Sequence, residues 1–238
     1  MIALEQADID KINFKGHDSR VVEVRGYQNY NLTPDSVEPL NNPTKKRPWV
    51  DTKVKSDFFA KLLDEINPKS YADFGSNLGY YVFLLASKGI KSCGVDYNSE
   101  YIDLCNVLKK RFGIKNATFN HTKLEWWKED HDMYDLVTVF NVIHHLYNRT
   151  EQYKDMGRLI DDFAIKSYNV VLFEFPTEND SKGHKWTMDT DYSEELFVRA
   201  IERRFRKYIR IKGQTEHRPH YLCRLSTHSG PLIQPTNE

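Results

Sequence analysis

The fold of this chain is decided by residues 71–81, YADFGSNLGYY, followed after an apolar segment by residues 93–96, CGVD. This order is typical of a strand ending in an acidic, glycine-containing turn, then a helix, then a second strand closed by a carboxylate. A nucleoside-like ligand lies across the carboxyl ends of such parallel strands. Gly75 and Gly79 let the backbone approach the ligand where a Cβ atom would collide. Asp96 can accept hydrogen bonds from both ribose hydroxyls.

The turn separates two classes of cofactor. A dinucleotide site uses G-x-G-x-x-G, so that the pyrophosphate sits against helix amides. In this chain Asn77 stands in the place of the middle glycine, Asp73 precedes the turn, and the bulky Tyr80 and Tyr81 follow it. A carboxylate two residues before the turn repels a pyrophosphate but can fix a cationic amino group. The pattern therefore predicts S-adenosyl-L-methionine, which carries an ammonium group at its methionine end and a sulfonium.

Three segments resemble the class I S-adenosylmethionine-dependent methyltransferases. Residues 73–79, with the pattern D-x-G-x-N-x-G, resemble motif I, and residues 95–97 resemble motif II. Residues 134–146, YDLVTVFNVIHHL, resemble motif IV with its extension. The resemblance covers residues 68 to about 225 and implies the Rossmann-like α/β fold of the family, a doubly wound, mostly parallel seven-stranded sheet with one antiparallel strand. The structural alternative is a Rossmann-like domain that transfers no methyl group.

The alternation of apolar segments along the chain predicts the same architecture. Strands are expected at residues 70–74, 91–95, 117–120, 136–140, 169–175, 208–212 and 221–225, and helices at 50–66, 78–88, 99–111, 152–167 and 194–204. The last two strands should pair antiparallel. Residues 1–50 are expected to be an N-terminal extension, with a short strand at 20–25, that contributes to the acceptor site. Residues 51–238 would form the methyltransferase domain, with a long loop at 177–191.

The composition of the chain indicates which binding partners and which cellular compartment to expect. Lys+Arg and Asp+Glu both number 34 in 238 residues, and a balanced charge argues against a sequence-independent grip on nucleic acid. The three cysteines have no paired spacing, which fits thiols in a reducing compartment. Acidic residues stand where a signal peptide would have a basic and then an apolar run. No window is apolar enough to span a membrane, so we expect a cytoplasmic protein.

The candidate cofactor-binding residues line the first turn or end the strands: Asp73, Gly75, Ser76, Asn77, Gly79, Tyr80, Asp96, Tyr97, Thr122, Leu124, Asn141 and Lys53. Asp73 would position the ammonium group, and Asp96 matches the ribose-binding acid of motif II, with Tyr97 placed to cover the adenine. Family members often place an acid after the third strand to bind adenine. This chain has none there, so Thr122 and Leu124 are assigned to the adenine.

Several of these residues have a structural alternative. Asp73 could cap its own turn, and Asp96 could be the N-cap of the helix that begins near Ser99. Lys53 resembles a basic residue that reaches the cofactor carboxylate in some methyltransferases, but it could equally lie on a solvated helix face.

The candidate catalytic residues are His145, His144 and Glu174. Residues 141–145, NVIHH, resemble the N-x-x-H-H pattern of many small-molecule and sugar O-methyltransferases, and the Asp/Asn-Pro-Pro-Tyr/Phe motif of amino-methylating enzymes is absent. A hydroxyl is a poor nucleophile at neutral pH, and an imidazole with a pKa near 6.5 suits the removal of its proton. His145 is preferred as the base, and the two consecutive histidines are expected to point in different directions. Glu174 would orient the histidine or bind an acceptor hydroxyl. The alternatives are a turn-capping pair of histidines and a structural ion pair at Glu174.

The predicted function is O-methylation of a sugar hydroxyl, free or in a glycan, by in-line methyl transfer with S-adenosyl-L-methionine. The loop residues His184, Trp186, Asp189 and Tyr192 would bind the sugar, because aromatic and acidic side chains suit its face and its hydroxyls. No tight ligand spacing such as H-x-x-x-H is present, so no metal is expected. Two alternatives remain: an RNA methyltransferase using the basic runs at 44–47 and 203–207, or a cofactor-binding protein without activity.

Overall fold

The computed structural model describes residues 12–14, 22–24, 28, 30–40, 52–123, 132–180, 191–213 and 215–225. The chain divides into two compact units, Met1–Leu124 and Glu125–Glu238. Among the described residues the strands form a four-stranded sheet near the N-terminus and a seven-stranded main sheet. Three strands of the main sheet come from the first unit and four from the second.

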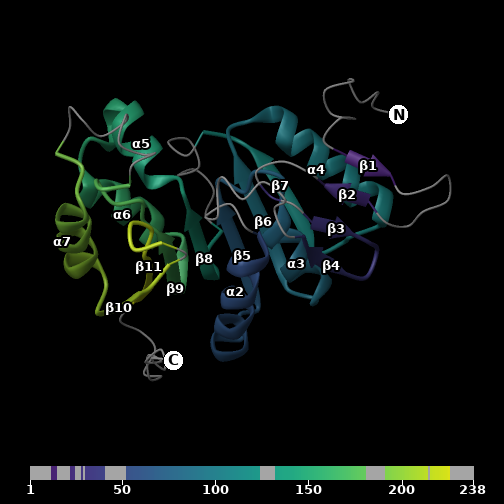
Figure 1. Ribbon diagram of the computed structural model, residues 1–238, viewed down its shortest axis with the longest axis horizontal. Helices are drawn as coiled ribbons and strands as arrows, with labels where there is room; N and C mark the ends of the chain where they lie inside the picture. Colours follow the sequence, from purple (N-terminus) through teal and green to yellow (C-terminus); the bar gives the residue numbers. More distant parts are fainter. Residues whose placement is uncertain are drawn as a thin grey trace. The chain divides into compact units, whose positions relative to one another are not determined.

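The first unit holds parallel strands β5 (Ser70–Phe74), β6 (Lys91–Asp96) and β7 (Ala117–His121). They alternate with α2 (Thr52–Ile66), α3 (Tyr80–Ser87) and α4 (Ser99–Phe112), and α3 packs on β5 and β6 (Figure 1). Phe74 pairs with Val95 across β5 and β6. Gly75, which follows β5, and Asp96, which ends β6, therefore lie at the same edge of the sheet.

The N-terminal sheet belongs to the first unit. It consists of β1 (Ile12–Phe14), β2 (Val22–Val24), β3 (Tyr30–Leu32) and β4 (Val37–Pro39), paired antiparallel in chain order. Only the strand at β2 was expected. The others were missed because strands of three residues are too short to show an alternating pattern.

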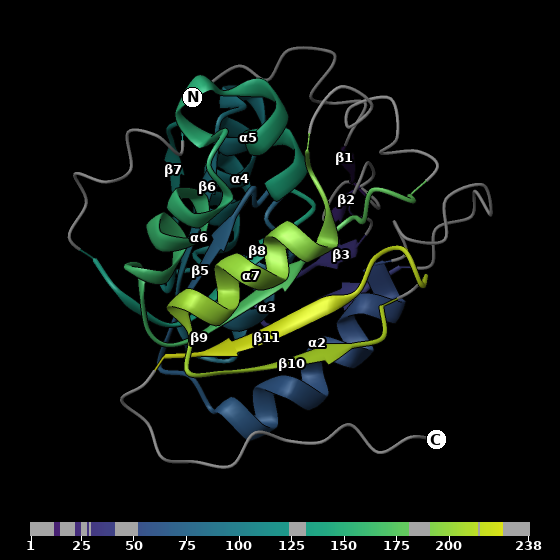
Figure 2. The same ribbon diagram turned by 90° about the vertical axis from the view of Figure 1, so that its left-hand side faces the viewer.

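The second unit holds β8 (Tyr134–Phe140), β9 (Ser167–Glu174), β10 (Lys207–Ile211) and β11 (His220–Arg224) in the order β10-β11-β9-β8. Strands β8 and β9 are parallel, and β11 is antiparallel to both of its neighbours, as the sequence predicted for one strand of the sheet. The helices of this unit are α5 (Ile143–Arg149), α6 (Met156–Ala164) and α7 (Glu194–Arg204). Figure 2 shows α7 running along β9, β11 and β10.

The expected helix at 152–167 is wrong in two places. The structure has a 3₁₀ turn, η3 (Glu151–Tyr153), before α6, and β9 already begins at Ser167. The side chain of Asp155 accepts hydrogen bonds from the amides of Gly157 and Arg158, at 2.8 and 3.3 Å, and so starts a new helix. The short helix α5 was not expected at all. The other predicted elements of the main sheet and its helices begin and end within about two residues of the observed ones.

The core of the second unit is built on aromatic contacts. The ring of Phe173 on β9 lies 6.0 Å from that of Phe163 on α6, and 5.5 and 6.1 Å from those of Phe197 and Phe205 at α7. All four side chains are buried. One strand residue thus joins both helices to the sheet. None of the helices in the described ranges is long and apolar enough to cross a membrane.

Replacing Phe173 with alanine should lower the free energy of unfolding by about 3–5 kcal/mol, because the vacated space opens between three rings. Tyr168→Ala on the same strand is the matched control, since the Tyr168 side chain is 53% exposed. We expect that control to change stability by less than about 0.5 kcal/mol. Urea unfolding followed by circular dichroism measures both, and equal losses would contradict the packing described here.

Candidate active site

The turn that follows β5, residues 75–80, is termed the cofactor loop. Three of its residues have left-handed backbone conformations, Gly75 (φ 75°), Asn77 (φ 50°) and Gly79 (φ 77°). A Cβ atom at Gly79 would lie 2.8 Å from the Phe119 ring and 2.9 Å from Cys105 Sγ. The missing side chain at Gly79 therefore makes room for the protein's own core. That it also lets the backbone approach a ligand stays a prediction.

Every backbone N–H of the cofactor loop is hydrogen-bonded within the protein. The acceptors are the Val95 carbonyl for Gly75 and Ser76, Asp96 Oδ2 for Asn77, Asn77 Oδ1 for Leu78, the Ser76 carbonyl for Gly79 and Gln28 Oε1 for Tyr80. A pyrophosphate site needs such amides to point at the ligand. Because none remains available, the loop cannot cradle a pyrophosphate.

The same loop presents oxygen atoms. The Gly75 carbonyl accepts no hydrogen bond from the described residues. The nearby carboxylates of Asp73, the last but one residue of β5, and Asp96, the last residue of β6, are 2% and 7% exposed. Carbonyl and carboxylate oxygens bind cationic donors, so this edge of the first unit suits a ligand that carries an ammonium group.

Asp96 is held by backbone hydrogen bonds on both of its carboxylate oxygens. Its Oδ2 accepts from the Asn77 amide at 2.8 Å and its Oδ1 from the Asn98 amide at 2.9 Å. Burial raises the pKa of Asp96, and the bonds from Asn98 and Asn77 oppose that rise. A carboxylate offers about four acceptor sites, so Asp96 keeps capacity for a ribose hydroxyl. The N-cap of α4 is Asn98, whose side chain accepts from the Tyr101 amide, and this excludes the N-cap alternative for Asp96.

Two candidates for the adenine end follow β6 and β7. Tyr97 has a 73% exposed side chain, and its carbonyl is 3.0 Å from His121 Nε2. The Thr122 amide donates to the Asp96 carbonyl at 3.1 Å, which ties the end of β7 to that of β6. Leu124 lies outside the described residues.

The remaining cofactor candidates of the first unit have other surroundings. The side chain of Tyr80 is fully buried, and its hydroxyl bonds Ser56 Oγ at 2.5 Å. Ser76 is also buried, and its hydroxyl has no partner among the described residues. Lys53 is half exposed on α2, with its Nζ 3.9 Å from Asp57 Oδ2. The geometry thus gives Tyr80 a packing role.

In the second unit, half-buried Asn141 and three buried charged side chains form what is termed the Asn141 cluster. Asn141, at φ 58°, directly follows β8, and its Nδ2 donates to Glu174 Oε2 at 3.0 Å. Its Oδ1 accepts from Arg218 Nη1, and Arg218 Nη2 lies 2.5 Å from Asp180 Oδ2. Glu174 is 1% exposed, and Asp180 and Arg218 are each 6% exposed. A carboxylate only accepts and a guanidinium only donates, so the orientation of the Asn141 amide is chemically fixed.

Strand register explains why these residues meet. Glu174 on β9 is level with Phe140 on β8 and with His220 on β11. Asn141 comes one residue after Phe140, and Arg218 two residues before His220. Asn141 and Glu174 were predicted site residues, but Arg218 and Asp180 were missed. The available signal was a charged residue just before the last strand, in HRPHY at residues 217–221.

The two histidines lie at the start of α5. Their ring centroids are 3.9 Å apart at an interplanar angle of 38°, so the expectation that they point in different directions is wrong. His144 is buried, and its Nδ1 has no hydrogen-bond partner among the described residues.

The histidine pair is neutral at pH 7. Burial, then His145 and Arg218, lower the pKa of His144 well below its usual value. Burial, then Arg149 and Arg218, lower the pKa of His145 to about 4. A base with that pKa is weaker than the one near 6.5 that the sequence suggested.

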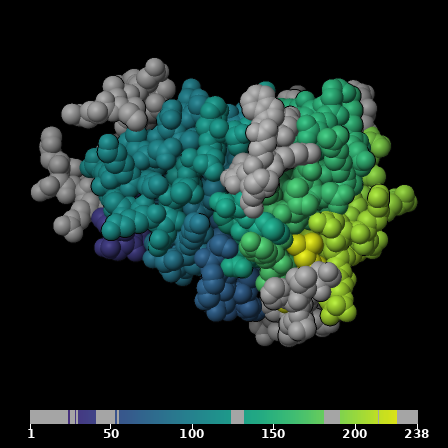
Figure 3. All heavy atoms as spheres, turned by 180° about the vertical axis from the view of Figure 1, so that it is seen from behind, coloured from purple at the N-terminus to yellow at the C-terminus, as the bar shows by residue number. Residues whose placement is uncertain are grey.

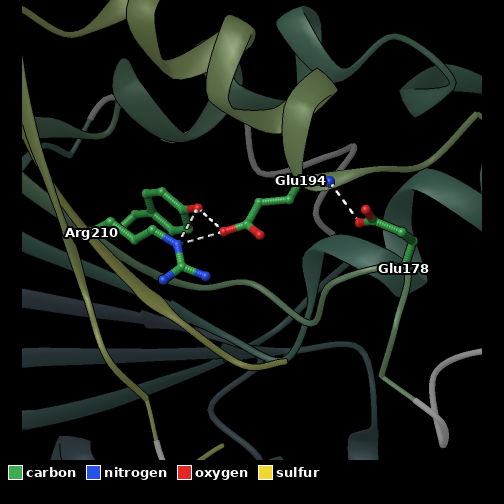
Figure 4. A network of polar contacts seen from close by, with 4 residues as sticks. Glu178, Glu194 and Arg210 are labelled. Atoms are coloured by element: carbon green, nitrogen blue, oxygen red, sulfur yellow. Dashed lines mark hydrogen bonds and ion pairs between the residues drawn. The ribbon is translucent and has the colours of Figure 1, made fainter. Parts of the chain in front are cut away.

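The segment that follows β9 is fixed at both of its described ends. Tyr192 was expected to bind the acceptor, but it is buried, donates to the Pro176 carbonyl at 2.7 Å and stacks on Phe175. Figure 4 shows Glu178 accepting from the Glu194 amide at 2.9 Å. The Glu194 carboxylate in turn accepts from Arg210 Nε at 2.7 Å and from the Tyr221 hydroxyl. His184, Trp186 and Asp189 lie outside the described residues.

Possible metal ligands are scattered in the described ranges. No group of three or more His, Cys, Asp or Glu side chains gathers there in a way that could hold a metal ion. The three cysteines, all described, are buried and form no disulfide.

The βαβ architecture and the cofactor loop define a class I S-adenosyl-L-methionine-dependent methyltransferase. A sequence model described as a methyltransferase domain matches residues 68–217, and the chain belongs to that family. No curated protein sequence matches the chain.

Solved structures with the same fold have low sequence identity. The bifunctional kinase-methyltransferase WbdD is 21% identical with a TM-score of 0.59, and the match covers 76% of this chain but only 40% of WbdD. Magnesium protoporphyrin IX methyltransferase (ChlM) from Synechocystis PCC 6803 with bound SAH is 15% identical, with a TM-score of 0.57 and coverage of 79% and 90%. The N-methyltransferase NodS from Bradyrhizobium japonicum WM9, in complex with S-adenosyl-L-homocysteine, is 14% identical, with a TM-score of 0.55 and coverage of 76% and 88%.

Replacing Asp96 with asparagine should weaken binding of S-adenosyl-L-homocysteine at least tenfold, or about 1.4 kcal/mol. The amide has one acceptor oxygen where the carboxylate has two, so the bonds to the loop and to the ribose cannot all form. Calorimetry on the full chain measures the change. Asp103→Asn, the same substitution at an exposed position of α4, is the control. Equal affinity in wild type and Asp96→Asn would contradict the assignment.

The neutral histidine pair predicts a pH dependence of stability. Because the folded pKa of His145 is about 4, the unfolded chain binds more protons below pH 6.5. The stability contributed by the neutral ring is therefore complete above about pH 6.5 and is lost as the pH falls toward and through 4. Thermal unfolding between pH 7 and pH 4 should show a smaller drop in Tm for His145→Gln than for wild type. His217→Gln controls for the loss of an imidazole, and parallel curves for wild type and His145→Gln would refute the prediction.

Proposed function

We propose that this protein methylates a hydroxyl group of a sugar, free or in a glycan, using S-adenosyl-L-methionine. The observation that carries the proposal is the charge of the Asn141 cluster. The cluster holds two buried carboxylates and one guanidinium: Arg218 binds Asp180 directly, and Asn141 bridges Arg218 to Glu174. With two carboxylates and one guanidinium, the cluster has a formal surplus of one negative charge, which disfavours an anionic acceptor. A neutral hydroxyl acceptor fits this environment better than a phosphate or a carboxylate.

The cofactor is proposed to bind at the cofactor loop and the adjacent strand ends. Asp73 and the Gly75 carbonyl would hold the ammonium group, Asp96 the ribose, and Tyr97 and Thr122 the adenine. Lys53 and Leu124 remain proposals for the cofactor carboxylate and the adenine. When bound, the cofactor supplies an electrophilic methyl group. The acceptor oxygen forms a bond to that methyl, the sulfur–methyl bond breaks with its electrons going to sulfur, and the acceptor proton goes to a base.

We assign His145 as the base that receives the proton, and Glu174 as the residue that binds the acceptor hydroxyl. An imidazole with a pKa of about 4 is unprotonated at neutral pH and can receive a proton, although its basicity is weak. Glu174 is presented by Asn141, which fixes one carboxylate oxygen. His144 would complete the pair as a neutral neighbour.

The basic run at 203–207, which suggested an RNA methyltransferase, has a structural explanation. Arg203 and Arg204 lie in the last turn of α7, where cations interact favourably with the helix dipole. Arg204 Nε is also 3.4 Å from Asp161 Oδ1. No observation on this helix favours RNA over a sugar.

The charge argument predicts which of two matched acceptors is methylated. A neutral monosaccharide glycoside and its phosphate ester should be compared with methyl-labelled S-adenosyl-L-methionine, over a panel of common sugars. We expect methylation of neutral members of the panel and at least tenfold lower kcat/KM for their phosphate esters. Methylation of the phosphate esters alone would overturn the proposed acceptor class.

Kinetics with the acceptor that is methylated then show whether His145 or Glu174 is the base. His145→Ala should lower kcat about 10²-fold, with the affinity for S-adenosyl-L-homocysteine unchanged. In wild type, kcat should rise with pH only through about pH 4 and be flat from pH 6 upward, because the ring is already neutral there. A flat profile with full activity in His145→Ala and a large loss in Glu174→Gln would transfer the role of base to Glu174.

A further inference from the structure

Two side chains from the N-terminal sheet region bind the backbone of the cofactor loop. Gln28 Oε1 accepts from the Tyr80 amide at 3.0 Å, and the Tyr30 hydroxyl donates to the Leu78 carbonyl. Gln28 is 8% exposed and Tyr30 is fully buried. In Figure 3 the purple atoms of the N-terminal region lie directly against the teal atoms of the same unit.

The Gln28 side chain supplies the hydrogen-bond acceptor that the N-terminus of α3 lacks. The N-cap of α3 is Gly79, which has no side chain to accept a hydrogen bond from the first amides of the helix. Gln28 provides the acceptor from 52 residues earlier in the sequence. Without it, the positive end of α3 would carry an uncapped amide next to a loop that has to receive a cationic group.

The Tyr30 contact fixes the other half of the turn. Its hydroxyl fixes the Leu78 carbonyl, and its ring lies 5.4 Å from that of Tyr80 and 6.5 Å from that of Phe83. At the start of the loop, the Val95 carbonyl on β6 accepts from the Gly75 and Ser76 amides. The loop is therefore held by the main sheet at one end and by the N-terminal sheet at the other.

We propose that Gln28 and Tyr30 are positioning residues that set the affinity for the cofactor through the conformation of the cofactor loop. The N-terminal sheet is then part of the cofactor site, beyond the acceptor role that the sequence suggested for residues 1–50. This inference rests on the assignment of the loop to the cofactor, which Asp96→Asn tests separately.

The test compares S-adenosyl-L-homocysteine binding and Tm in matched variants of the full chain. Gln28→Met keeps the side-chain length without the acceptor, and Tyr30→Phe keeps the ring without the hydroxyl. Each should raise the Kd about three- to tenfold, the range expected for one lost hydrogen bond. Gln28→Glu restores an acceptor and should return the Kd toward that of wild type. Thr33→Ala is the control, because it removes only the hydrogen bonds with Asp35 and Ser36 in the turn between β3 and β4.

The outcomes separate positioning from simple stabilisation. We expect Thr33→Ala to lower Tm without changing the Kd, whereas Gln28→Met and Tyr30→Phe change the Kd at temperatures where they are fully folded. If those two variants lose Tm but keep the wild-type Kd, the inference is overturned. It is overturned equally if Thr33→Ala weakens binding as much as they do. If Asp96→Asn also binds normally, the cofactor assignment fails instead.

Hydrogen exchange on the wild type gives a second measurement that needs no variant. Because coupling is reciprocal, S-adenosyl-L-homocysteine should slow amide exchange in β3 and β4 as well as in residues 75–80. Protection of the loop with unchanged exchange in β3 and β4 would contradict the inference.

Discussion

The hydrogen bond from the Asn77 amide to the Asp96 carboxylate joins the ends of two parallel strands, and the chemistry of the first unit depends on it. It fixes Asn77 in its left-handed conformation, and it holds Asp96 with one oxygen anchored to the loop and the other to Asn98. The other backbone N–H groups of the loop are also bonded within the protein, so none of them is left to bind an anion. We expect the selectivity for a cationic cofactor over a pyrophosphate to follow from this pattern of hydrogen bonds and not from the number of glycines.

The second unit uses asparagine in a similar way. Asn141, like Asn77, follows a buried parallel strand with a positive φ, which its short polar side chain tolerates. Its amide lies between an acceptor, Glu174, and a donor, Arg218, so the side chain links the ends of β8 and β9 to the segment before β11. Arg218 in turn forms an ion pair with Asp180, so the asparagine belongs to a chain of polar contacts that ends on a carboxylate at either side.

Sequence reasoning predicted what depends on local pattern. The alternation of strands and helices, the acid at the end of β6 and the polar residues after β8 and on β9 are set by periodicity and by the fold's directional rules. It missed features that depend on contacts between distant residues. Nothing near Arg218 signals Asp180, and the three-residue strands β1, β3 and β4 show no alternation. Burial cannot be read from residue type alone, which is why Tyr80 and Tyr192 were taken as ligand contacts although both are packed in the core.

The complete hydrogen bonding of the cofactor loop also has an entropic consequence. A loop whose amides already have partners, and whose left-handed residues are already set, loses little freedom when a ligand arrives. Binding energy is then available for the ligand itself and is not spent on folding the turn around it. The entropy cost of ordering the loop is incurred when the protein folds. Residues as far away in sequence as Gln28 and Tyr30 contribute to that order.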